Sequence, residues 1–124
     1  MADFLFVYGT LMRGRSNHHY LKECKFIGRG IIKGFSLYAV SPWYPGVVYK
    51  KGGRVKGEVY EIDEEVLRKI DDLEDNGYLY RRKKISVFME ESQIIEAWVY
   101  IWLGKVFEED EINFNEQPWK RNEK

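Results

Sequence analysis

The position of Glu74 in the sequence makes it a candidate general base and acid. Residues 64–74 have the pattern of a helix. Stepped at about 100° per residue, its apolar side chains form one stripe: Val66, Leu67, Ile70 and Leu73. Glu74 falls inside that stripe. A carboxylate turned toward an apolar core is costly when charged, so its pKa rises toward neutrality, where a general base and acid operates.

The remaining acids of this helix lie far from the stripe and are expected to face solvent: Glu64, Glu65, Asp71 and Asp72. Glu74 itself has an alternative. If the helix frays by Asp75, the Glu74 side chain turns to water or pairs with Arg81 or Arg82.

A second candidate is the segment Tyr8-Gly9-Thr10-Leu11, which leaves a short apolar strand at residues 4–8. Successive backbone amides at such a turn can form a concave site for a carboxylate. The segment has neither the Gly-Lys-Ser/Thr nor the GxGxxG spacing of a nucleotide phosphate site. The alternative is an ordinary turn with Gly9 at positive φ.

Other reactive residues have weaker patterns. Glu58 shares a strand face with Tyr60, so it could point inward as a second acid, or simply pair with a Lys or Arg. The adjacent His18 and His19 point apart and make a poor metal chelate, which predicts a surface position and no metal site. Cys24 has no base facing it and is expected to be a packing thiol.

These residues need elements to hold them. The chain is expected to form α+β structure: a small, mostly antiparallel β-barrel or curled sheet of six to seven strands, with one main helix and one short helix. Strands are expected at about residues 26–40, 47–49, 54–62, 80–89 and 94–102, besides the first. Lys51-Gly52-Gly53 is expected to be a hairpin turn. Asp63 is expected to cap the main helix, Asn76-Gly77 to end it, and Ser16 or Asn17 to cap a short helix reaching Cys24.

Length and composition fit one domain, expected over residues 1–103, followed by a polar tail over residues 104–124 that is partly packed or loosely held. The 124 residues include 20 Lys+Arg and 20 Asp+Glu, a balance that argues against nucleic acid or an acidic membrane as partner. A single cysteine excludes an intrachain disulfide and, with no apolar run of spanning length, favours a cytoplasmic protein.

Three blocks of the chain together resemble gamma-glutamylcyclotransferase-like proteins, specifically the branch of gamma-glutamylamine cyclotransferases and plant avirulence-induced-gene-like proteins. The similarity spans roughly residues 4–102. Its blocks are Tyr8-Gly9-Thr10-Leu11 with Arg13-Gly14 and Asn17-His18, then residues 57–63, then Leu67 with residues 71–74 and Tyr80-Arg81-Arg82.

The resemblance implies a barrel enzyme without metal or cofactor, in which a gamma-glutamyl amine, amino acid or peptide loses 5-oxoproline. The catalytic glutamate falls on Glu74 and the substrate-binding loop on Tyr8, Gly9, Thr10 and Leu11. Tyr80 is expected to help orient the substrate. Supporting roles are open for Glu58, Pro45 and Trp119. The identity of the leaving amine and the oligomeric state stay open.

Two other functions are alternatives to the enzyme, and the first of them would use the same residues. A non-catalytic module of this fold would bind a small amino-acid-like ligand without turnover, because a fold does not fix a function. A protein-interaction domain would instead use the ring-rich loop around Trp43 and Tyr44. The enzyme is the favoured hypothesis, and release of 5-oxoproline separates it from both.

Overall fold

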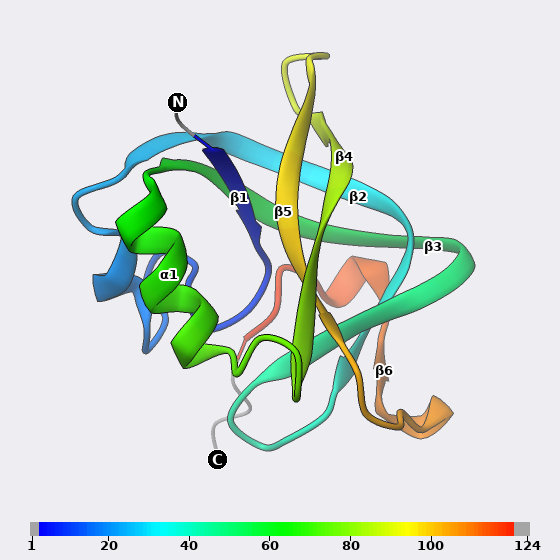
Figure 1. The fold of residues 1–124 in the computed structure, drawn as a ribbon. Helices are drawn as coiled ribbons and strands as arrows, with labels where there is room; N and C mark the ends of the chain where they lie inside the picture. The colour runs from blue at the N-terminus through cyan, green and yellow to red at the C-terminus, as the bar shows by residue number, and fades with distance from the viewer. Residues whose placement is uncertain (1–2, 121–124) are drawn as a thin grey trace.

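The computed structural model describes residues 3–120. In chain order the elements are β1 (Asp3–Val7), η1 (His18–Leu21), β2 (Lys25–Ala39), β3 (Pro45–Ile62), α1 (Glu64–Leu73), β4 (Tyr80–Met89), β5 (Ile94–Trp102), η2 (Glu108–Asp110), β6 (Glu111–Ile112) and η3 (Phe114–Glu116). The η elements are single 3-10 turns. The expected α+β class, with one main helix, is confirmed (Figure 1).

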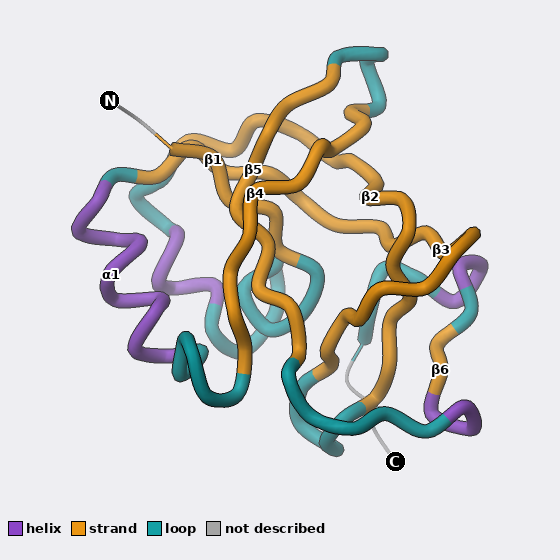
Figure 2. Tube along the Cα trace, turned by 45° about the vertical axis from the view of Figure 1, so that its right-hand side comes forward, coloured by secondary structure: helices purple, strands orange, loops and turns teal. Residues whose placement is uncertain are grey.

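Five strands close into a barrel, because each strand from β1 to β5 pairs with two others of these five. The short β1 pairs antiparallel with β3 and parallel with β5, and β5 continues through β4 to β2. The antiparallel β2–β3 pair then closes the ring, and β6 is added outside it on β2. Figure 2 shows β2 and β3 curving around the barrel while β4 and β5 cross it as a hairpin.

The expected hairpin turn at Lys51-Gly52-Gly53 is wrong, because β3 is one strand of 18 residues. A hairpin turn reverses the chain, but here the residues before and after the glycines pair with the same partner, β2. Phe35 pairs with Tyr49 and Lys33 pairs with Arg54, so the extra residues of β3 form a bulge. Bulged, strongly curved strands allow two long strands to wrap a small barrel.

Helix α1 lies against one side of the barrel, beside η1 (Figure 1). Leu67 and Ile70 are buried, as the apolar stripe predicts. The expected cap is confirmed, since the Asp63 carboxylate accepts a hydrogen bond of 2.8 Å from the Val66 backbone N–H. The helix ends at Leu73, and Asp75 takes the first positive φ (52°), ahead of the expected Asn76-Gly77.

The expected short helix up to Cys24 is only the 3-10 turn η1. Asn17 occupies its N-cap position without capping it. Its side chain donates instead to the Thr10 hydroxyl oxygen at 2.9 Å, so a residue expected to start a helix holds the loop after β1.

Residues beyond β5 return to the barrel. β6 pairs with β2 at Leu37 and Tyr38, and the Gln117 side chain accepts from the Lys56 backbone N–H at 2.8 Å. Trp119 is buried in the core. None of the helices within residues 3–120 has the length and apolar character that a membrane crossing requires.

Candidate active site

A cavity opens where the end of β1, the β2–β3 connection, the end of α1 and strands β4 and β5 meet. The segment Tyr8 to Leu11 and the Glu74 carboxylate both belong to its wall. The full lining is Phe6, Val7, Tyr8, Gly9, Thr10, Leu11, Tyr44, Pro45, Glu74, Tyr80 and Tyr100. The structure therefore brings together the two features that the sequence singled out, although 63 positions separate Leu11 from Glu74.

Glu74 is the residue directly after α1, and its backbone N–H still donates to the Ile70 carbonyl at 2.8 Å. Because this position keeps helical geometry, the side chain continues the apolar face of the helix toward the cavity. Burial raises the pKa of the Glu74 carboxyl from 4.5 to about 7. Among the residues of 3–120 that line the cavity, Glu74 is the one carboxylic acid.

The loop from Gly9 to Leu11 is held by its carbonyl groups. The Gly9, Thr10 and Leu11 carbonyls accept from Met12 N, Asn17 N and His18 Nδ1 at 3.2, 2.8 and 2.9 Å. The backbone N–H groups of the same three residues donate to no main-chain carbonyl within residues 3–120. The loop is thus fixed from one side while its amides stay available to a ligand.

The requirement for glycine at position 9 comes from packing. Gly9 does not have the positive φ of an ordinary turn, because it is not among the described residues with positive φ. A Cβ atom at this position would lie 2.9 Å from the ring carbons of Pro45. Glycine therefore allows the loop to pack closely against Pro45 at the start of β3, which also lines the cavity.

Two tyrosine hydroxyls donate within the wall of the cavity. Tyr8 Oη donates to the Tyr100 carbonyl at 2.6 Å, and Tyr80 Oη donates to the Pro45 carbonyl at 2.8 Å. Burial is the main cause that raises the pKa of both phenols, and the Glu74 charge adds to it. Both phenols therefore stay protonated near neutral pH, and their oxygen atoms keep lone pairs that can accept a hydrogen bond.

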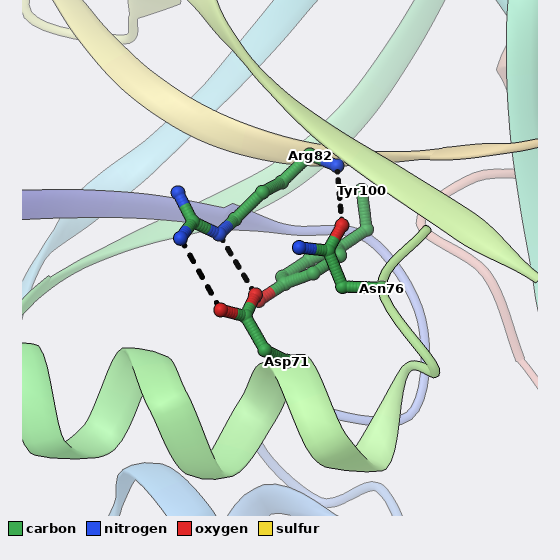
Figure 3. A network of polar contacts seen from close by, with 4 residues as sticks. All are labelled: Asp71, Asn76, Arg82 and Tyr100. Carbon is green, nitrogen blue, oxygen red and sulfur yellow. Dashed lines mark hydrogen bonds and ion pairs between the residues drawn. The ribbon is translucent and has the colours of Figure 1, made fainter. Parts of the chain in front are cut away.

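The expectation that Asp71 faces solvent is wrong. Its carboxylate accepts from Arg82 Nε at 2.7 Å, Arg82 Nη2 at 3.2 Å and Tyr100 Oη at 2.6 Å (Figure 3). The Arg82 backbone N–H also donates to Asn76 Oδ1 at 3.1 Å. The helical wheel could not predict these contacts, because they depend on two side chains that reach Asp71 from other elements: Arg82 on β4 and Tyr100 on β5. Tyr100, which also lines the cavity, has no distinctive signal inside the apolar run of β5.

Three expected supporting residues lie in different places. Pro45 lines the cavity. Glu58 is outside the lining, where its Oε1 accepts from Arg13 N and Tyr60 Oη, both at 3.0 Å. Trp119 is also outside it, and its carbonyl accepts from Arg15 Nε and Nη2 at 3.0 and 2.7 Å.

The remaining reactive candidates serve the scaffold. His18 packs against the Tyr60 ring and reaches the Leu11 carbonyl, so it supports the loop rather than lying free on the surface. Cys24 is half-buried, and burial raises the pKa of its thiol. No group of three or more His, Cys, Asp or Glu within residues 3–120 is placed to hold a metal ion.

Comparison with known proteins shows which family the chain belongs to. Residues 5–121 match the family described as gamma-glutamyl cyclotransferase, AIG2-like, and the chain belongs to that family. Gamma-L-glutamyl-butirosin B gamma-glutamyl cyclotransferase of Niallia circulans is 44% identical over 104 residues, 79% of this chain and 65% of the relative. Mouse gamma-glutamylaminecyclotransferase is 40% identical over 96 residues, 67% and 62% of the two chains.

The fold has close structural neighbours. The crystal structure of an AIG2-like protein from mouse superposes with a TM-score of 0.74 at 34% identity, covering 82% of this chain and 78% of the other. Family, relatives and fold together define a gamma-glutamylcyclotransferase-type enzyme.

Proposed function

We propose that this enzyme releases 5-oxoproline from a gamma-glutamyl amine, amino acid or peptide, with Glu74 as the single proton carrier. The α-amine of the substrate attacks its own γ-carbonyl carbon. One C–N bond forms and closes a five-membered ring, the γ C–N bond breaks, and the amine beyond it leaves. Because the attack is intramolecular, the main task of the cavity is to hold the glutamyl chain folded.

The proton moves from one nitrogen to the other. The α-amine is largely an ammonium group near neutral pH and must lose a proton before it attacks. Ionised Glu74 takes that proton, and protonated Glu74 then delivers it to the departing nitrogen. A carboxyl with a pKa of about 7 is suited to both steps, because it populates both forms at the pH of the reaction.

The loop and the tyrosines are proposed to bind the substrate. The free amides of Gly9, Thr10 and Leu11 would receive the substrate α-carboxylate or the oxyanion that develops on the γ-carbonyl. The Tyr8 and Tyr80 oxygen atoms, whose protons are already donated to the wall, would accept from the α-ammonium group. Donors for the anionic end and acceptors for the cationic end match an amino acid headgroup.

The observation that carries this proposal is one carboxyl of raised pKa sharing a cavity with a loop of free amides. The test is incubation of the protein with a panel of gamma-glutamyl amines, gamma-glutamyl amino acids and glutathione, followed by assay of 5-oxoproline. Release from at least one substrate, lost in Glu74→Gln, is the expected result. Thermal stabilisation by these compounds with no release from any would instead identify the non-catalytic binding module.

A further inference from the structure

We propose that Asp71, Arg82 and Tyr100 form a positioning network that fixes the last turn of α1 and balances the charge beside Glu74. This inference rests on the proposed role of Glu74 as proton carrier. None of the three residues is proposed to transfer a proton itself. They act through Glu74, with the Arg82 and Tyr100 side chains reaching Asp71 on the helix from β4 and β5 (Figure 3).

The geometry ties one helical turn to two strands. The Arg82 guanidinium from β4 contacts both oxygens of Asp71, and the Tyr100 hydroxyl from β5 donates to Oδ1. Arg82 also holds Asn76, two residues after Glu74, through its backbone N–H. Glu74 therefore lies between two anchored residues, Asp71 and Asn76, which limits how far its side chain can turn away from the cavity.

The network also reaches the loop on the other side of the cavity. Tyr100 lines the cavity, and its carbonyl accepts from the Tyr8 hydroxyl at 2.6 Å. Asp71 is thus joined by a hydrogen bond to the Tyr100 hydroxyl, and the backbone carbonyl of the same Tyr100 is joined by another to Tyr8, the first residue of the loop segment. Through Tyr100, the position of the proposed proton carrier is linked to that of the proposed substrate-binding amides.

The network also contains a pair of opposite charges, Asp71 and Arg82. Asp71 precedes Glu74 by three residues, a spacing at which helical side chains are neighbours, about 5–6 Å apart at Cβ. A bare Asp71 carboxylate would repel the ionised form of Glu74, and Arg82 offsets that repulsion. Burial mainly raises the pKa of the Tyr100 phenol, the Asp71 and Glu74 charges raise it further, and the Arg82 charge lowers it, so all three charges act on one hydroxyl.

Within residues 3–120, the titratable side chains that line the cavity with Glu74 are all phenols: Tyr8, Tyr44, Tyr80 and Tyr100. Asp71, on α1, and Arg82, on β4, lie outside that lining. The Asp71–Arg82 pair is therefore the pair of charges whose balance can be altered without changing the lining of the cavity.

Opposite charge changes should shift Glu74 in opposite directions. Asp71→Asn leaves the Arg82 cation uncompensated and should lower the pKa of Glu74 by about one unit. Arg82→Met keeps an unbranched side chain but removes the guanidinium that lies over the Trp98 ring; it leaves Asp71 uncompensated and should raise the pKa of Glu74 by about one unit. The double variant removes both charges and should return the pKa close to its original value, as should Arg82→Lys, which keeps the charge.

The experiment is an NMR titration of the Glu74 side-chain carboxyl carbon, assigned by its loss in Glu74→Gln, together with the pH profile of 5-oxoproline release. Glu65→Gln and Lys69→Met remove charges from an exposed pair on the same helix and serve as controls. They should leave both readouts unchanged. Shifts of Asp71→Asn and Arg82→Met in the same direction, or none, would overturn the proposal.

The titration also separates this inference from the proposed function. If the protein releases no 5-oxoproline, the proposed function fails, but the opposite NMR shifts still test the network. Tyr100→Phe keeps the ring and the carbonyl that Tyr8 uses and removes only the hydroxyl. It should lower kcat about tenfold with little change in KM, and an unchanged kcat would contradict the positioning role even if the charge variants fail to fold.

Discussion

Glu74 and Glu58 are both half-buried carboxylates, yet their surroundings differ completely. Glu58 accepts two hydrogen bonds, from the Arg13 backbone N–H and from the Tyr60 hydroxyl, so its charge is held by partners. Glu74 faces the cavity, where burial alone raises its pKa to about 7. The difference shows that partial burial alone does not decide whether a carboxyl holds its proton near neutral pH. Within residues 3–120 no hydrogen-bond donor is recorded on the Glu74 carboxylate, and an unpartnered buried carboxylate binds its proton more tightly.

The largest expected effect is on turnover. Glu74→Gln removes the proton carrier but keeps the shape of the side chain, so 5-oxoproline release should fall by at least about 100-fold. Glu58→Gln is the matched control, because its amide oxygen can still accept from Arg13 and Tyr60. Steady-state kinetics should show kcat/KM within about threefold of the unmodified enzyme for Glu58→Gln. Equal losses in both variants would contradict the distinction drawn between these acids.

The pH dependence is the next effect in size. Because ionised Glu74 must accept the proton of the α-ammonium group, kcat/KM should fall about tenfold per pH unit below about 7. The profile of 5-oxoproline release between pH 5 and pH 9 measures it. A limb near pH 4.5 would mean that Glu74 is not desolvated in the working enzyme.

Stability should change in opposite directions for the two acids. Folded Glu74 keeps its proton up to about pH 7, whereas an unperturbed carboxyl loses it near pH 4.5. The stabilising contribution of this group is therefore complete below pH 4.5 and is lost as pH rises through 7. At pH 8, Glu74→Gln should raise the free energy of unfolding by about 1–2 kcal/mol, since it removes the charge that burial disfavours.

Glu58→Ala should instead lower the free energy of unfolding by about 1–3 kcal/mol, because the Arg13 N–H and the Tyr60 hydroxyl lose their acceptor. Urea denaturation at pH 5 and pH 8 measures both variants. The gain for Glu74→Gln should shrink at pH 5. A gain of equal size at both pH values would show that its cause is not the titration of Glu74.

The smallest effect concerns the loop. Asn17→Ala removes the hydrogen bond to the Thr10 hydroxyl, which should loosen the segment carrying the free amides. A loss of about 1 kcal/mol corresponds to a rise of roughly fivefold in KM, with a smaller change in kcat. Ser16→Ala, at the exposed neighbouring residue, should have no effect and serves as control. Unchanged KM in both would mean that the loop needs no side-chain support.

Much of the fold followed from local patterns. Strands β4 and β5 lie where residues 80–89 and 94–102 predicted them, and Asp63 caps α1 as expected. The errors occurred where local and tertiary signals conflict. Lys51-Gly52-Gly53 has the composition of a turn, but continued pairing with β2 makes it a bulge. Asn17 is a residue type that often caps helices, but its side chain donates a hydrogen bond to the Thr10 hydroxyl oxygen instead.

The candidate site divides in the same way. The sequence alone determined that Glu74 continues an apolar helical face and that Gly9 follows a buried strand, because both are properties of neighbouring residues and of a fixed helical period. Tertiary structure alone decided that these features share a cavity, that Asp71 meets Arg82 and Tyr100, and that Glu58 is held outside by two donors. Those contacts depend on how the barrel closes, and no local pattern records which strand passes beside which helix.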